Sequence, residues 1–173
     1  MPIIAKRSAS FNPAPEGPQQ AVCVDVIDLG MEEEQWGDGD AKMKPKVRLM
    51  WHSVEIDPET KKPYSIVEKY TLSLHEKAKL RSVLEAWRGR KFTDEEAEGF
   101  DVETLLGVNA YISIVHNKQW ANISAIMPLP KGMTPIPITK GFVRKADKEA
   151  EANKSMPPDH HEDGFPSDED IPF

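Results

Sequence analysis

Cysteine is nearly absent from this chain of 173 residues, in which Cys23 stands alone. A single cysteine excludes an internal disulfide framework and suits a reducing compartment, so we expect a cytoplasmic protein. Long apolar runs are also missing, which predicts that no segment spans a membrane. The apolar run within residues 1–10 is too short for a secretory signal. We therefore expect no membrane partner.

Motifs of catalysis and metal binding are missing as well. The sequence has no Gly-rich phosphate loop, no nucleophile elbow and no Cys/His set with zinc spacing. Asp38-Gly39-Asp40 lacks the rest of a calcium loop. The run His160-His161-Glu162-Asp163 lies in a stretch too polar to fix a coordination geometry. We expect a protein that is not an enzyme and has no cofactor or metal.

Apolar residues make up only 39% of the chain, and the deficit lies at its two ends. Residues 8–20 and 140–173 show no periodic apolar pattern. We therefore divide the chain into a flexible N-terminal arm, a folded domain, a linker and an acidic tail. These segments cover residues 1–20, 21–132, 133–158 and 159–173.

The net charge of −7 argues against a strongly basic, histone-like protein. Six acidic residues in the tail account for most of that charge, because the tail contains no lysine or arginine. The remaining body is close to neutral and can still hold a local basic groove.

Five segments have the alternation or the β-branched composition typical of strands. They are residues 21–29, 46–56, 65–74, 108–116 and 121–127. The Gly- and acid-rich stretch 30–45 is expected to be a loop.

Alternation also predicts which strand residues face the core. In the first strand, Val22, Val24 and Val26 are expected to share one face. In the second strand, one face holds Val47, Leu49 and Trp51, and the other holds Lys46, Arg48, Met50 and His52.

Between the third and fourth strands the apolar period changes from two to 3.6 residues, which predicts a helix. Its apolar stripe consists of Leu80, Val83, Leu84 and Trp87, and Gly89 is expected to end it. Two capping boxes predict helix starts, one at Ser73 with Glu76 and one at Thr93 with Glu96.

The predicted order is β-β-β-α-β-β, in a mainly β protein. Five strands with a helix between the third and the fourth follow the order of the OB-fold, a five-stranded Greek-key barrel. A helix at that position would plug the base of the barrel. Another small α+β fold with the same element order remains the alternative.

The tail ends in an acidic run followed by apolar residues: Asp168, Glu169, Asp170, Ile171, Pro172 and Phe173. Such a polar stretch cannot bury enough apolar surface to fold, so we expect it to be disordered. The acids would steer it toward a basic pocket, and Ile171, Phe173 and the terminal carboxylate would dock there. The alternative is an ordinary solvated terminus.

This tail and strand order resemble the single-stranded DNA-binding proteins of bacteria and phages. The segments YTLSLHEKAKLRSVLEAWRGRKFT, FDVETLLGVNAYISIVHN and ANISAIMPLPKG resemble proteins of tailed-phage replication modules, within residues 21–132. The resemblance implies an OB-fold that binds single-stranded DNA in replication, recombination and repair, within the host cytoplasm. It also implies that the tail recruits partner enzymes.

The chain departs from that family in the segment before the tail. Residues 140–158 form a short segment rich in Lys, Glu and Ala, whereas the bacterial proteins have a long linker rich in Gly and Gln. Tetramer assembly is therefore not carried over, and the oligomeric state stays open, a homo-oligomer included.

Sequence-independent binding of a single strand needs cations for the phosphates and aromatic rings for the bases, and OB barrels bind across strands two and three. The candidates on those elements and their loops are Trp36, Lys44, Lys46, Arg48, His52, Lys61, Lys62, Tyr64, Lys69, Tyr111, His116, Lys118 and Trp120.

Each aromatic candidate has a structural alternative. Trp51, Trp87 and Tyr70 follow apolar faces and are expected in the core. Trp36 and Trp120 lie in loops and could stack on bases or cap the core, and the lysines could simply be solubilising charge. An OB-fold adaptor with little or no DNA binding is therefore the alternative function. A nuclease is disfavoured because the ordered region lacks clustered metal-binding carboxylates.

Overall fold

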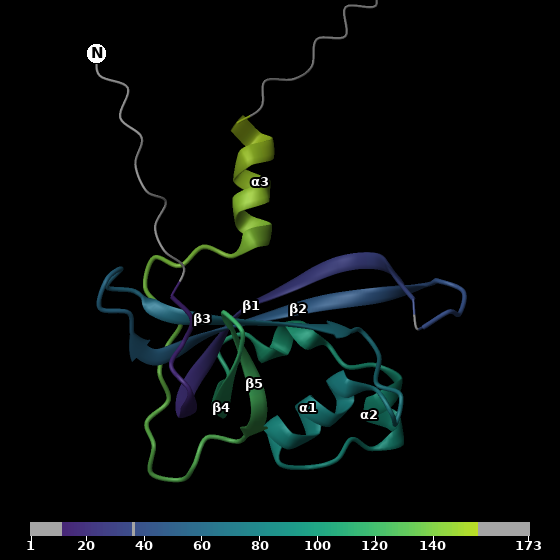
Figure 1. Ribbon diagram of the computed structural model, residues 1–173, viewed down its shortest axis with the longest axis horizontal. Helices are drawn as coiled ribbons and strands as arrows, with labels where there is room; N and C mark the ends of the chain where they lie inside the picture. Colours follow the sequence, from purple (N-terminus) through teal and green to yellow (C-terminus); the bar gives the residue numbers. More distant parts are fainter. Residues whose placement is uncertain (1–11, 36, 156–173) are drawn as a thin grey trace, which may run out of the picture.

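The strands form one curved antiparallel sheet in the order β3-β2-β1-β4-β5 (Figure 1). The structure is a computed structural model that describes residues 12–35 and 37–155. Its strands are β1 (Gly17–Glu34), β2 (Lys42–Ile56), β3 (Pro63–Thr71), β4 (Asn109–Asn117) and β5 (Trp120–Met127). The predicted mainly β fold is therefore confirmed.

In the described part of the chain, three α-helices and one 3-10 helix accompany the sheet. Helices α1 (Lys79–Arg88) and α2 (Asp94–Glu98) and the 3-10 helix η1 (Val102–Leu105) lie between β3 and β4, and α3 (Lys145–Ser155) follows the last strand. Figure 1 shows α3 on the opposite side of the strands from α1 and α2. None of the helices in the described ranges combines the length and apolar composition needed to cross a membrane.

The two edge strands of the sheet approach each other, which gives it a barrel-like shape. β3 and β5 are in contact, and the backbone N–H of Ile123 donates a hydrogen bond of 2.9 Å to the carboxylate of Glu68. Helix α1 packs against both strands and buries Leu80, Leu84 and Trp87. A helix with one apolar stripe therefore covers the core where the two edges meet.

The core contains the aromatic residues that the sequence predicts to face inward. Trp51 is fully buried, and Tyr70 and Trp87 are almost so. The rings of Trp51 and Trp87 pack at a centroid distance of 5.8 Å and an angle of 54°. Cys23 is also buried, and desolvation raises the pKa of its thiol to about 12, so that it stays protonated.

The expectation that Val22, Val24 and Val26 share one face is wrong. The strand has an irregularity between Cys23 and Asp25, where one extra residue interrupts its pairing with β2. A bulge reverses the alternation beyond it. Val26 therefore joins Cys23 in the core cluster, whereas Val22 and Val24 are buried outside that cluster.

The expected loop 30–45 is mostly strand. β1 continues to Glu34 and β2 begins at Lys42, so the two strands form a long hairpin. Acidic residues of β1 face lysines of β2, with Glu32 opposite Lys44 and Glu34 opposite Lys42. Cross-strand pairs of opposite charge favour such pairing even though the apolar residues here, Met31 and Met43, stay exposed.

The two predicted capping boxes have different outcomes. Ser73 does not begin a helix, because α1 starts at Lys79 with Ala78 as its N-cap. The Ser73 hydroxyl instead accepts a hydrogen bond from the backbone N–H of His75. Thr93 caps α2 as predicted and accepts from the backbone N–H of Glu96.

A strap, residues 134–145, crosses the outer face of the sheet after β5. Gln20 donates to the carbonyl of Thr134 at 2.8 Å, and the Asn109 side chain makes two hydrogen bonds of 2.9 Å with the backbone of Ile136. The strap lies within the segment that the sequence assigns to a linker. It contains no strand, yet these contacts hold it against β1 and β4.

The far end of the strap is fixed by a charge cluster at Arg144. The guanidinium donates to Asp25 at 3.1 Å and binds both oxygens of Glu103 at 3.0 and 3.1 Å. The backbone N–H of Lys145 donates to the second oxygen of Asp25 at 2.9 Å. The Asp25 side chain is only 2% exposed, so this carboxylate depends on the strap for its partners.

Candidate nucleic-acid interface

The outer face of β2 and β3 presents the polar residues that the alternation predicts there. The register places Arg48 opposite Lys69 and Met50 opposite Val67. Val67 is 41% exposed, whereas the intervening Leu49 is fully buried on the inner side. Two cations and two apolar side chains thus form an open surface with a cleft at either end.

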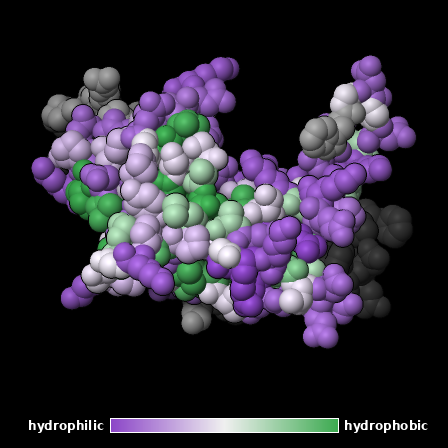
Figure 2. All heavy atoms as spheres, turned by 90° about the horizontal axis from the view of Figure 1, so that it is seen from below, coloured by the Kyte–Doolittle hydropathy of each residue, from purple (hydrophilic) through white to green (hydrophobic). Residues whose placement is uncertain are grey.

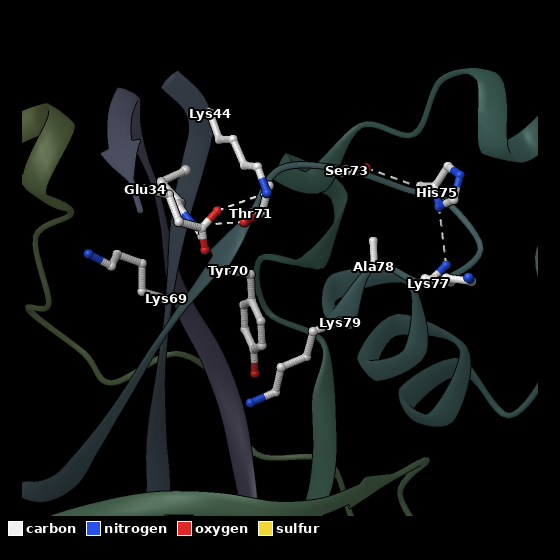
Figure 3. Close-up of a pocket in the computed structure, with 11 residues that line it drawn as sticks. Glu34, Lys44, Lys69, Tyr70, Thr71, Ser73, His75, Lys77, Ala78 and Lys79 are labelled. Carbon is white, nitrogen blue, oxygen red and sulfur yellow. Dashed lines mark hydrogen bonds and ion pairs between the residues drawn. The ribbon is translucent and has the colours of Figure 1, made fainter. Parts of the chain in front are cut away.

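The first cleft, the lysine groove, lies between the ends of β2 and β3 and the segment that leads into α1 (Figure 3). It has a volume of ≈ 560 Å³. Its lining consists of Glu34, Lys44, Lys46, Lys69, Tyr70, Thr71, Ser73, His75, Lys77, Ala78 and Lys79. Five lysines around one groove provide the electrostatics for an anionic ligand.

Carboxylates of β1 already neutralise the strand lysines of this groove. Glu34 forms ion pairs with Lys44 at 3.0 Å and Lys46 at 3.3 Å, and Lys69 pairs with Glu32 at 3.0 Å. Hydrogen bonding from Lys44 lowers the pKa of Glu34, so its carboxylate stays ionised at neutral pH. Lys46 is 9% exposed and also donates to Thr71. A phosphate would have to exchange with these carboxylates.

The second cleft, the strap cleft, lies between the strap and the other end of the β2–β3 face. It has a volume of ≈ 400 Å³. The lining residues are His52, Lys62, Pro63, Ser65, Thr139, Lys140, Gly141, Phe142, Val143 and Lys148. The His52 ring contacts Phe142 edge-on at a centroid distance of 4.9 Å, and its Nδ1 lies 2.9 Å from the Thr139 hydroxyl.

Burial lowers the pKa of His52, because a charged imidazolium would lose its hydration beneath the strap. The unfolded chain then binds a proton more readily than the folded one, so stability falls as the pH drops below the ordinary histidine value of about 6.5. We expect the free energy of unfolding to decrease between pH 7.5 and 5.5, and His52→Gln to weaken this decrease. Urea unfolding at several pH values measures both slopes, and identical slopes would contradict the assignment.

The other sequence-predicted residues that the structure describes line neither cleft. Tyr64 and Tyr111 are half-buried, and Tyr64 packs against the core. His116 is held by the carbonyl of Ala14 at 2.6 Å. Other exposed candidates lie at turns or strand ends: Lys61, Lys118 and Trp120. Trp36 and the predicted tail residues Asp168 to Phe173 lie outside the described residues.

Some residues of the two clefts escape the sequence analysis. Lys77 precedes α1 and Lys79 begins it. The sequence predicts a helix start at Ser73 instead, so these two lysines are not recognised as part of a groove. Lys140, Phe142 and Lys148 lie where no strand or apolar helical pattern signals structure, so the sequence assigns them to a linker. No sequence pattern distinguishes Lys140 and Lys148 from lysines that only keep the surface soluble.

The underside of the molecule differs from these clefts. Seen from below, apolar residues form patches among hydrophilic ones (Figure 2). A hollow of ≈ 240 Å³ beside α1 is lined by Leu84, Trp87, Arg88, Arg90, Phe100, Thr104, Leu105 and Val108. Because its walls are mostly apolar, this hollow offers fewer cations to a phosphate backbone than the two lysine-rich clefts do.

No family model matches the chain, and no curated protein matches it.

Proposed function

We propose that this protein binds single-stranded DNA without sequence preference, in phage DNA replication or recombination. The observation that carries the proposal is the outer face of β2 and β3. There Arg48 lies beside Lys69 of the lysine groove, and the strap cleft opens at the other end of the same face. Cations along such a path suit a phosphate backbone, and open apolar side chains between them suit the bases.

The barrel is proposed to be an OB-fold. The strand order, the contact between β3 and β5, and the helical segment between β3 and β4 support that topology. OB barrels use this same strand pair for oligonucleotides. The acidic tail is proposed to recruit replication or repair enzymes through Ile171 and Phe173, with its acids steering the encounter.

Fluorescence anisotropy of a labelled oligo-dT strand tests the binding directly, with duplex DNA of the same length as the control. We expect saturable binding that weakens as salt rises and is weak or absent for the duplex. Anisotropy suits this chain because Trp51 and Trp87 are buried and would report poorly on a surface ligand. No binding at low salt would refute the proposal.

A protein-interaction adaptor with weak or no DNA binding is the second candidate. The pairing of Glu32 and Glu34 with the β2–β3 lysines favours it, because paired lysines attract phosphate less than free ones. A failed oligo-dT titration combined with capture of replication proteins by the tail would select this function.

Removing the carboxylate of Glu34 should strengthen DNA binding. Glu34→Gln frees Lys44 and Lys46 for phosphate, so we expect several-fold tighter binding of oligo-dT at low salt and a steeper salt dependence. Glu33→Gln is the matched control, because it removes the same charge from the exposed neighbouring residue. Equal effects of the two substitutions would show that net charge, rather than the freed lysines, is responsible.

A further inference from the structure

Three lysines meet in the strap cleft, and among the described residues none of them has a carboxylate partner. Lys62 precedes β3, Lys140 belongs to the strap, and Lys148 lies in α3. Within residues 12–35 and 37–152, no ion pair involves any of the three side chains. The described lining residues include no aspartate or glutamate. This cleft therefore differs from the lysine groove, where carboxylates neutralise the strand lysines.

The cleft is held in place on both sides of Lys140. Thr139 is fixed by its contact with His52, and Arg144 is fixed by Asp25 and Glu103. The backbone between these two anchors carries Lys140, Gly141 and Phe142. Lys148 follows one turn into α3, where its backbone N–H bonds to the carbonyl of Arg144. The lysines are thus presented by ordered backbone.

Like charges gathered in one cleft repel one another, and an anion bound between them relieves that repulsion. Lysine ammonium groups bind phosphate as point charges, and the hydroxyls of Ser65 and Thr139 add neutral polar groups to the lining. Phe142 contributes an apolar wall. A volume of ≈ 400 Å³ exceeds the size of a single phosphate group, so the adjoining sugar or base has room beside it.

The cleft also lies in line with the proposed DNA path. His52 faces Ser65 in the register. Along the same face of the two strands, the neighbouring pair is Met50 and Val67, and the pair beyond that is Arg48 and Lys69. An extended strand that crosses the β2–β3 face would therefore pass from these cations into the strap cleft.

We propose that the strap cleft holds a backbone phosphate of the bound single strand. The strap and α3 then form one wall of the DNA site. This inference rests on the proposed function, because it assigns a second contact region for the same ligand. It also gives the segment between the barrel and the tail a direct role in binding.

The test compares two double variants in the oligo-dT anisotropy titration over a series of salt concentrations. Lys140→Gln with Lys148→Gln removes charge from the cleft. Lys91→Gln with Lys131→Gln removes the same charge at exposed positions elsewhere. Each lost phosphate contact lowers the slope of log affinity against log salt by about 0.7, which corresponds to about fivefold weaker binding at 0.1 M salt. We expect this change in the cleft variant only.

Equal slopes for the two double variants, with normal binding by the unchanged protein, would overturn the cleft inference and leave the proposed function standing. Absence of binding by the unchanged protein would overturn both. Should a variant fail to fold, NMR of the unchanged protein decides: the Gly141 amide should shift on addition of oligo-dT, and the Gly132 amide should not. An unmoved Gly141 amide at saturation would refute the inference.

Discussion

Trp51→Ala is expected to lower the free energy of unfolding by about 3–5 kcal/mol, the usual cost of truncating a buried aromatic side chain. Trp51 is fully buried and packs against Trp87, which joins β2 to α1. The substitution leaves a cavity between the sheet and its covering helix. Urea unfolding followed by circular dichroism measures the change. A loss below about 1 kcal/mol would mean that the site collapses around alanine.

Two milder variants separate packing from hydrogen bonding. Within the part of the chain that the structure describes, the Trp51 Nε1–H is buried without a hydrogen-bond partner, whereas Trp87 Nε1–H donates to the carbonyl of Asn109 at 2.9 Å. Trp51→Phe removes an unsatisfied donor, and Trp87→Phe removes a satisfied one and leaves an acceptor unpaired. We therefore expect Trp87→Phe to be the more destabilising. The reverse order would contradict this account.

Arg144→Ala is expected to have the second large effect, because it leaves the buried carboxylate of Asp25 without its cation. Breaking a buried ion pair from one side costs about 3–5 kcal/mol when the site cannot admit water. The loss is smaller if the strap lifts and lets water reach Asp25. The two responses differ in hydrogen exchange, since a lifted strap also frees the Ile136 amide that Asn109 holds.

Matched variants sharpen this second prediction. Arg144→Lys keeps the charge but loses the paired bonds to Glu103, so an intermediate loss is expected. Asp25→Asn combined with Arg144→Ala removes the buried charge and should recover part of the stability. If Arg144→Ala changes neither the free energy of unfolding nor the exchange of Ile136, the cluster does not anchor the strap.

Alternation predicts the faces of β2 and β3 well because both strands keep regular pairing through their central residues. Val47, Leu49 and Trp51 are buried, and Arg48 and Met50 lie on the opposite face. The same pattern fails in β1, because the extra residue at Val24 reverses the alternation. A bulge leaves no mark in the apolar pattern, so the error cannot be avoided from periodicity alone.

The hairpin and the strap show two further limits of the pattern. The acidic residues Glu32 and Glu34 lead to the prediction of a loop, but the lysines opposite them on β2 make a strand favourable. The strap is held by side-chain bonds from Gln20 and Asn109 to its backbone, and such long-range bonds follow only from the folded arrangement. The sequence thus predicts the strand lysines of the candidate site but misses Lys140 of the strap and the lysines at α1 and α3.

The double pairing of β1 bears on the order in which the protein folds. The second half of β1 pairs with β2 early in the chain, whereas its first half waits for β4, with Gly17 opposite Ile114. Contacts between residues so distant in sequence form slowly. During synthesis the β1–β2–β3 meander can therefore form first, and closure of the sheet has to follow the emergence of β5. The strap follows β5 in the chain, so the outer face of the sheet is covered only after the strands have been made, and apolar strand surface left uncovered at this stage invites association between nascent chains.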